Sequence, residues 1–471
     1  MEGRPSRKTF QLRLAELVET IRNEILTGVW REGDFLPSEK EYAKRYRLSN
    51  KSVRQGMEIL LKEGLIVKIP RVGTKVLKRP AGAVRAGPVK TRKTLRFVCH
   101  PSLLQEAAME TLLGEFRKEH PDIRVELMPA AGNSLFNWYT TVKKSFDEGA
   151  DAVTLNYNGF ANFMEHGGLD ELESMIPDPL AYSFLNETFS FNGELKVRPI
   201  VFSPLVLCYN KSHFREFRVP EPESGWRWTD LFEQTEKLAV EQDRIGFYFH
   251  FPSTNRWPVF LLQSGIRFDK DERGRLVYNR SKLREALRVC RNIYTQGRFP
   301  LFLSETDADA EELFFNGKVS VIMTTYFSLN HYERSAPFEY DVAPLPVLRE
   351  AKTLLMAIGV AVNAHSPLKD QAMQLANFLG SPRAQLIIRQ NTLSIPALVS
   401  AAEWSGEEIM YRPSRFLAYR DQIPHFRTFS ALNLTIQELD LFFREAKLYW
   451  SGLETENAVT ARLENLLFSD P

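Results

Sequence analysis

The sequence has few of the features that hold secreted and membrane proteins together. Its 471 residues include three cysteines, Cys99, Cys208 and Cys290, which stand far apart with no CxxC spacing. This excludes a disulfide framework and disfavours a zinc site, so we expect three buried, small hydrophobic side chains. The longest apolar run, 354–362, falls far short of the ~20 residues that cross a bilayer.

A secretory signal is also missing. Charges are scattered through the opening MEGRPSRKTFQLRLAEL, which leaves no apolar segment of about 7 to 15 residues and has no nearby cysteine for lipid attachment. We therefore expect a cytoplasmic protein with no membrane partner.

Motifs for catalysis are lacking as well. The eight histidines show no HExxH spacing, and neither a GxSxG elbow nor a GxxxxGK[ST] phosphate loop occurs. A glycoside hydrolase would need a paired acid and base at loop ends, and no such pair can be identified. We expect a protein that is not an enzyme and has no cofactor or bound metal.

Carboxylates are absent from residues 64–105, which hold ten Lys and Arg. Residues 1–96 carry 23 Lys and Arg against 10 Asp and Glu, whereas the rest carries 38 against 49. Only the N-terminal part is suited to a polyanion such as DNA, although a solvated linker face would also explain the charge run.

The length predicts more than one domain, because 471 residues exceed what one compact core holds. Residues 80–93 are rich in Pro, Gly, Ala and basic side chains without an apolar period. We place a linker there, between an N-terminal domain at 1–79 and a larger unit at 94–471 that should form two lobes.

Three helices and a hairpin are predicted in the N-terminal domain. The first helix carries its apolar face at Leu14, Leu17, Val18, Ile21 and Ile25. Ser38 and Glu41 have the spacing of a capping box at the start of the second helix. The stretch LIVKIPRVGTKVL should form two short strands, a wing.

Ser49 can cap a third helix, whose apolar stripe is Val53, Met57, Leu60 and Leu61. Its first turn carries the polar residues Asn50, Lys51, Ser52, Arg54 and Gln55. Amide and cationic groups at a helix start can read base edges in the major groove, so this first turn, together with Ser49 before it, is a candidate for DNA binding.

The segment EILTGVWREGDFLPSEKEYAKRYRLSNKSVRQGMEILLKEGLIVKIPRVGTKV resembles the winged helix-turn-helix (α+β) domain of GntR-family transcription regulators. The resemblance implies an operator of double-stranded DNA, bound by a homodimer because one short helix reads few base pairs. It places at DNA-contacting positions Lys40, Lys51, Arg54, Gln55, Arg71, Gly73 and Thr74. The family commonly has Arg where Lys40 and Asn50 stand, so its operator sequence does not transfer.

Strands and helices alternate at the start of the large unit: LRFVCH, a helix through Phe116, IRVELM, a helix at 139–146, DAVTLN and a helix at 160–166. This alternation predicts a parallel α/β sheet with helices on both faces. Ligands of such sheets bind beyond the carboxyl ends of the strands.

These segments, with GELKVRPIVFSPLVLCYNKSHF, GWRWTDLFEQTEKLA, LFFNGKVSVIMTTYF, YDVAPLPV and LANFLGSPRAQLII, resemble family 1 extracellular solute-binding proteins. The resemblance implies a two-lobed, type II periplasmic-binding-protein-like fold with crossover strands near 200–203 and 357–363. It implies a small-molecule effector, a sugar or oligosaccharide, in the cleft. The cleft positions it suggests are His100, Ser102, Asn156, Tyr157, Asn158, Ser203, Asn255, Arg256, Trp257 and Tyr326.

Among these positions we favour Tyr157, Asn158, Trp257 and Tyr326, since aromatic faces and amides suit sugar rings. Trp257 and Tyr326 could instead be core aromatics. The sequence thus predicts a solute-responsive DNA-binding regulator. The alternative is a solute-binding receptor of an ABC-type uptake system, which the basic N-terminal domain disfavours.

Overall fold

The computed structural model describes residues 13–77 with short gaps at 15–16, 19, 23, 26–28, 47 and 70–71, and then residues 93–128, 138–272, 276–295, 304–332 and 338–468. The chain divides into two compact units, Met1–Lys90 and Thr91–Pro471. The division falls within the segment predicted as a linker. Lys93, at the end of that segment, is instead the first residue of a strand.

The first unit has the elements predicted for it. They are α2 (Glu39–Tyr46), α3 (Asn50–Lys62), β1 (Ile66–Ile69) and β2 (Gly73–Val76). Described residues between 13 and 25 are helical, and Leu17, Val18 and Ile21 are buried against the apolar face of α3. The capping box is confirmed, because the backbone N–H of Ser38 donates to Glu41 at 2.7 Å and that of Glu41 to Ser38 Oγ at 3.3 Å.

The second unit opens with the predicted alternation. Its first lobe contains β3 (Lys93–Val98), α4 (Leu103–Glu106), α5 (Met109–Glu119), β4 (Ile123–Met128), α6 (Trp138–Asp147), β5 (Ala152–Asn156), α7 (Tyr157–Glu165), α8 (Ser183–Thr188), β6 (Ser190–Phe191) and β7 (Glu194–Leu195). Later segments of the same lobe are α15 (Lys369–Leu379), α16 (Pro382–Asn391), β15 (Ile395–Pro396) and α17 (Val399–Ala402). β3 pairs in parallel with both β4 and β5, as expected.

The second lobe is built from α9 (Lys211–Phe217), α10 (Trp228–Leu238), β9 (Ile245–Tyr248), α11 (Pro258–Ser264), β10 (Asp269–Lys270), β11 (Leu276–Val277), α12 (Arg280–Thr295), α13 (Asp307–Phe315), β12 (Val319–Thr325), α14 (Leu329–Tyr332) and β13 (Tyr340–Ala343). The chain ends with α18 (Tyr419–Gln422), β16 (Phe426–Arg427), α19 (Ile436–Trp450) and α20 (Glu456–Phe468). Helices α19 and α20 pack on α12.

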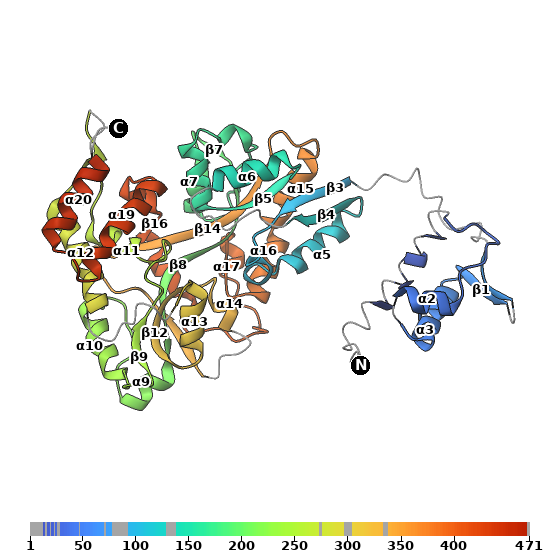
Figure 1. Ribbon diagram of the computed structural model, residues 1–471, viewed down its shortest axis with the longest axis horizontal. Coiled ribbons are helices and arrows are strands. Elements are labelled where there is room, and N and C mark those ends of the chain that lie inside the picture. Colours follow the sequence, from blue (N-terminus) through green and yellow to red (C-terminus); the bar gives the residue numbers. More distant parts are fainter. Residues whose placement is uncertain are drawn as a thin grey trace. The chain divides into compact units, whose positions relative to one another are not determined.

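Two long antiparallel strands, β8 (Arg198–Asn210) and β14 (Thr353–Val362), join the lobes (Figure 1). Their sheet has the order β4-β3-β5-β14-β8-β12-β9. The first part of β8 pairs with β14, and residues 205–209 pair with β12 of the other lobe. The crossovers predicted at 200–203 and 357–363 thus fall on β8 and at the end of β14.

One large core spans both lobes of the second unit, and all three cysteines are buried in it, as expected. Among the described residues, none of the helices combines the length and the apolar character that a bilayer crossing requires. In the same part of the chain, no group of three His, Cys, Asp or Glu side chains is placed to hold a metal ion.

Candidate DNA interface and solute cavity

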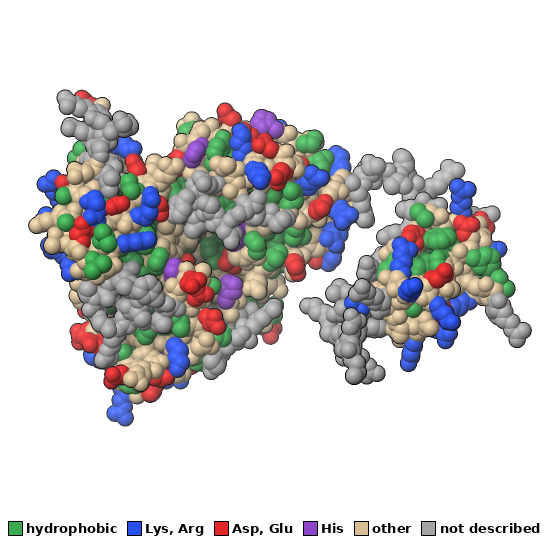
Figure 2. Space-filling view, in the orientation of Figure 1, with side chains coloured by type: hydrophobic (Ala, Val, Ile, Leu, Met, Phe, Trp, Pro, Cys, Tyr) green, Lys and Arg blue, Asp and Glu red, His purple; other side chains and the backbone are tan. Residues whose placement is uncertain are grey.

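Helix α3 has one buried and one exposed face. Val53, Met57 and Leu60 are buried, while Asn50, Lys51, Arg54 and Gln55 are exposed, as are Ser49 before the helix and Lys40 on α2. Figure 2 shows Lys and Arg side chains on the surface of this unit. The exposed face therefore offers the cationic and amide groups that base recognition requires.

Ser52 departs from the prediction. Its side chain is 6% exposed, and its hydroxyl lies 2.7 Å from Ser49 Oγ, which also accepts the backbone N–H of Ser52 at 3.2 Å. Ser52 lies on the core side of α3, one turn before the buried Gly56. Ser49 is confirmed as the N-cap, and Ser52 supports that cap instead of offering its side chain to DNA.

Glu39, at the start of α2, forms hydrogen bonds with residues of both α3 and the wing. Its carboxylate accepts a hydrogen bond from Arg54 Nε at 2.7 Å and another from Lys68 Nζ on β1 at 2.6 Å. Partial burial raises the pKa of Glu39, but the two cationic donors outweigh this and leave it below its ordinary value. Glu39 thus fixes the direction of Arg54 while both cations keep exposed surface.

The wing is an antiparallel hairpin in which Lys68 is paired with Thr74 and Ile69 with Gly73. Gly73 has φ of +146°, which favours glycine, and a Cβ there would lie 3.3 Å from the Phe35 ring. Arg71 lies outside the described residues. The wing residues Gly73 and Thr74 therefore have the conformation expected of them, and their contact with DNA remains a prediction.

The second unit contains a cavity of about 290 Å³ whose wall comes from both lobes and from β14. Six of the ten predicted ligand residues line it: His100, Ser102, Asn156, Tyr157, Asn158 and Asn255. Sequence reasoning missed the other lining residues, Glu106, Trp138, Thr154, Thr254, Phe327, Phe429 and the β14 segment 354–358. The cavity lies beyond the carboxyl ends of β3 and β5, where parallel sheets bind ligands.

Local hydrogen bonds hold this wall in place. The backbone N–H of His100 donates to Thr154 Oγ1 at 2.9 Å, which joins the ends of β3 and β5. Asn156 caps α7, because its Oδ1 accepts the Gly159 N–H at 2.8 Å. Asn158 Nδ2 lies 3.5 Å from Asn255 Oδ1 of the second lobe, so the two lobes meet at the cavity.

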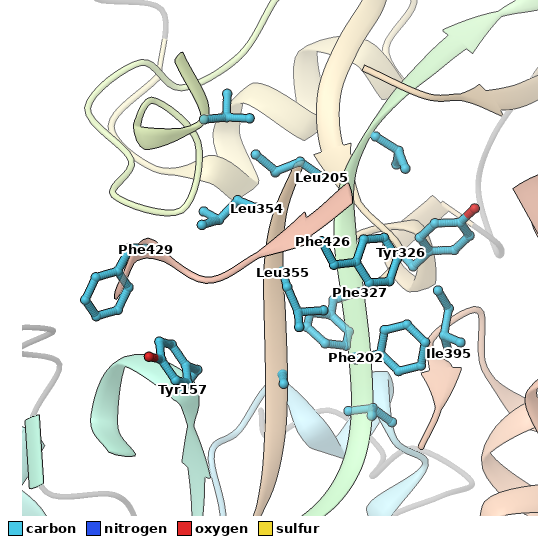
Figure 3. Packing of buried hydrophobic residues seen from close by; sticks show 14 of the residues in the cluster. Tyr157, Phe202, Leu205, Tyr326, Phe327, Leu354, Leu355, Ile395, Phe426 and Phe429 are labelled. Carbon is cyan, nitrogen blue, oxygen red and sulfur yellow. The ribbon is translucent and has the colours of Figure 1, made fainter. Parts of the chain in front are cut away.

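Aromatic rings form much of the remaining wall. The Tyr157 and Phe429 rings lie 5.4 Å apart between centroids, and Figure 3 shows them near each other. The indole Nε1 of Trp138 is a buried donor with no hydrogen-bond partner among the described residues. Flat apolar faces with a few polar groups suit the C–H surface and hydroxyls of a sugar.

A hydrogen-bonded chain runs from His100 to the buried Glu106. His100 Nδ1 lies 2.9 Å from Ser102 Oγ, which donates to Glu106 Oε2 at 2.9 Å. Burial raises the pKa of Glu106 to about 7, and the Ser102 hydrogen bond lowers it only in part. Burial also lowers the pKa of His100. At neutral pH the cavity therefore contains a neutral imidazole and a carboxyl group near its midpoint.

Trp257 and Tyr326 are core residues, which corrects their assignment to the cleft. Neither has exposed surface. Trp257 stacks on Phe442 of α19 with ring centroids 5.6 Å apart and an interplanar angle of 10°. Tyr326 donates its hydroxyl proton to the Phe416 carbonyl at 2.8 Å. Both are covered by segments from the C-terminal part of the chain, far away in sequence.

Ser203 and Arg256 also stay outside the cavity. Ser203 is fully buried on β8, where its hydroxyl accepts the Tyr326 N–H at 2.8 Å and donates to Pro204 O at 2.7 Å. Arg256 is 3% exposed and forms an ion pair with Glu311 at 3.5 Å. Both side chains therefore have structural roles in this conformation.

A larger hollow of about 550 Å³ lies elsewhere, lined by residues of α10, β9 and α12 and by Val347 and Leu348. None of its lining residues comes from the first lobe or from a crossover strand, and none was predicted to bind a ligand. The smaller cavity is the better ligand site, because both lobes and a crossover strand contribute to its wall.

Comparisons with known proteins agree with the two units. Residues 111–411 match the family of bacterial extracellular solute-binding proteins, and residues 14–76 match bacterial regulatory proteins of the gntR family. An uncharacterized lipoprotein of Streptomyces antibioticus is 25% identical over 64% of this chain and 69% of its own length. An sn-glycerol-3-phosphate-binding periplasmic protein of Pectobacterium atrosepticum is 22% identical over 67% of this chain and 76% of its own.

Solved structures share the fold of the second unit. An ABC substrate-binding protein of Listeria monocytogenes, in complex with cycloalternan, has a TM-score of 0.65 at 20% identity and covers 80% of this chain and 98% of its own. A maltose-bound protein of T. maritima also has a TM-score of 0.65, at 18% identity, with 79% and 98% covered. The chain therefore belongs to the family of bacterial extracellular solute-binding proteins, and it carries a gntR-type DNA-binding domain ahead of its solute-binding unit.

Proposed function

We propose that the protein is a cytoplasmic transcription regulator in which a sugar or oligosaccharide, bound in the 290 Å³ cavity, changes the affinity of the winged helix for operator DNA. One observation carries this proposal: a single chain has a gntR-type helix with an exposed cationic face and a cavity whose wall is shared by two lobes. A solute that contacts both lobes favours their closed form and can shift a conformational equilibrium.

The chemistry of the cavity supports a saccharide, since aromatic rings, amides and hydroxyls line it. Structures with the same fold were solved with maltose and with cycloalternan, and one relative is named for sn-glycerol 3-phosphate. We propose a homodimer on a pseudo-palindromic operator, because two recognition helices double the number of base contacts. Cytoplasmic location follows from the proposed DNA partner.

Selection and titration with the full chain test this function. Double-stranded DNA selected from a random pool would be titrated by fluorescence anisotropy at fixed salt, with and without maltose, maltotriose, glucose and glucosamine. We expect at least one saccharide to change the DNA affinity by roughly 5- to 150-fold, the range of typical coupling energies. Failure to select any DNA, or an affinity that no bound saccharide changes, would contradict the proposal.

The names of the relatives favour a second candidate, a receptor that delivers solute to a membrane permease. The gntR-type domain speaks against it, because such a receptor has no use for a DNA-recognition helix. Cell fractionation separates the two: recovery with the nucleoid supports the regulator, and recovery outside the cytoplasmic membrane supports the receptor.

A further inference from the structure

Charged side chains are scarce in the described wall of the solute cavity. Among the described residues that line it, Glu106 is the only Asp or Glu, and there is neither a Lys nor an Arg. The wall also contains the imidazole of His100, and burial lowers its pKa and so favours its neutral form. The charge that the described wall can offer a ligand is therefore the negative charge of the Glu106 carboxylate.

Glu106 is buried without a charged partner. Its side chain is 9% exposed and borders the cavity, and its carboxylate accepts a hydrogen bond from Ser102 Oγ at 2.9 Å. Within the described part of the chain, no Lys or Arg nitrogen forms an ion pair with it, whereas two other buried acids of this unit, Glu311 and Asp341, are paired with Arg256 and Lys211.

An unpaired buried carboxylate is costly, since desolvation is not offset by a counter-charge. A ligand that brought an ammonium group into the cavity would supply that charge and form a charge-assisted hydrogen bond. An anionic ligand would meet like charge at Glu106, and its oxygens would find no Lys or Arg in the described wall. The site is therefore selective by charge as well as by shape.

We propose that the cavity takes an amino sugar, whose ammonium group pairs with the Glu106 carboxylate while its ring lies against the aromatic wall. This inference rests on the proposed saccharide-binding function and narrows it to a cationic solute. Ser102 then acts as a positioning residue, because its hydroxyl holds one carboxylate oxygen and leaves the other for the ligand.

Four monosaccharides that share one ring but differ in charge test the proposal: glucosamine, glucose, N-acetylglucosamine and glucose 6-phosphate. Each would be titrated into the full chain by calorimetry at neutral pH. We expect glucosamine to bind at least tenfold more tightly than glucose or N-acetylglucosamine, the size of a charge-assisted hydrogen bond. Glucose 6-phosphate should bind most weakly.

The variant Glu106→Gln keeps the shape and removes the charge, so it should lose at least tenfold in glucosamine affinity and stay within twofold for glucose. Glu110→Gln, on the exposed start of α5, is the matched control and should change neither. Three results would overturn the inference and leave saccharide binding intact: equal affinity for glucose and glucosamine, an unchanged glucosamine affinity in Glu106→Gln, or a preference for glucose 6-phosphate. Absence of binding by all four sugars would also overturn the inference, and the maltose and maltotriose titrations described above would then decide whether a saccharide is the effector.

Discussion

Two carboxylates in the two units have opposite environments. Glu39 lies on the surface of the first unit between the cations of Arg54 and Lys68, and its pKa is lowered. Glu106 lies in the wall of a cavity with a serine hydroxyl as its partner, and burial raises its pKa to about 7. The first arrangement leaves two cations at the exposed surface where we propose that DNA binds, and the second leaves a carboxylate in the wall of the proposed solute site.

The largest effect should come from the core beside the cavity. Trp257→Ala should lower the free energy of unfolding of the second unit by about 3 to 5 kcal/mol, because a fully buried indole stacked on Phe442 leaves a void. Urea unfolding measures this, with the half-buried Trp226→Ala as the control that loses less. If Trp257→Ala lost saccharide affinity without losing stability, the assignment of Trp257 to the core would be wrong and the residue would belong to the cavity wall.

A pH series of unfolding tests the environment of Glu106. Its folded pKa of about 7 exceeds the ordinary 4.5, so its protonation favours the folded state below pH 4.5, and that contribution is lost as the pH rises through 7. Between pH 5 and 8, wild type should therefore lose about 2 to 3 kcal/mol relative to Glu106→Gln. Glu311 and His100 also titrate but are present in both proteins, so they cancel. A constant difference would contradict the raised pKa.

The recognition surface is tested by Arg54→Ala. We expect operator affinity to fall roughly ten- to hundredfold, because an exposed guanidinium that reads a base or a phosphate is removed. Saccharide affinity should not change. Lys62→Ala, at the other end of α3, is the matched control. Equal losses in the two variants in a gel-shift titration would place the recognition surface elsewhere.

The smallest effect should come from Glu39→Gln, which removes a negative charge from between two cations. Affinity for non-specific DNA should rise by roughly two- to fivefold, the scale of exposed ion pairs. The salt dependence should become steeper, since Arg54 and Lys68 become free to neutralise phosphates. Anisotropy at several salt concentrations measures both, with Glu58→Gln on α3 as the control. A fall in affinity would show that Glu39 matters more by orienting Arg54.

Much of the molecule follows from signals local in sequence. Capping residues Ser38, Glu41 and Ser49 set the starts of α2 and α3, and the alternation of strands and helices set the first lobe. The resemblance to solute-binding proteins predicted ligand positions at His100, Ser102, Asn156, Tyr157 and Asn158, and these residues meet at one cavity because the carboxyl ends of parallel strands lie at one edge.

Burial was decided by contacts between distant segments. The sequence offers Trp257 and Tyr326 as loop aromatics, but α19 covers the first and Phe416 the second, and both covering segments follow more than 80 residues later. Glu106 gives no signal in sequence, since a Glu in a short helix is ordinarily solvated. Local backbone preference and the chemistry of each residue can be read from the sequence. Only tertiary packing decides which side chains stay exposed to solvent, because desolvation depends on what the rest of the chain places around them.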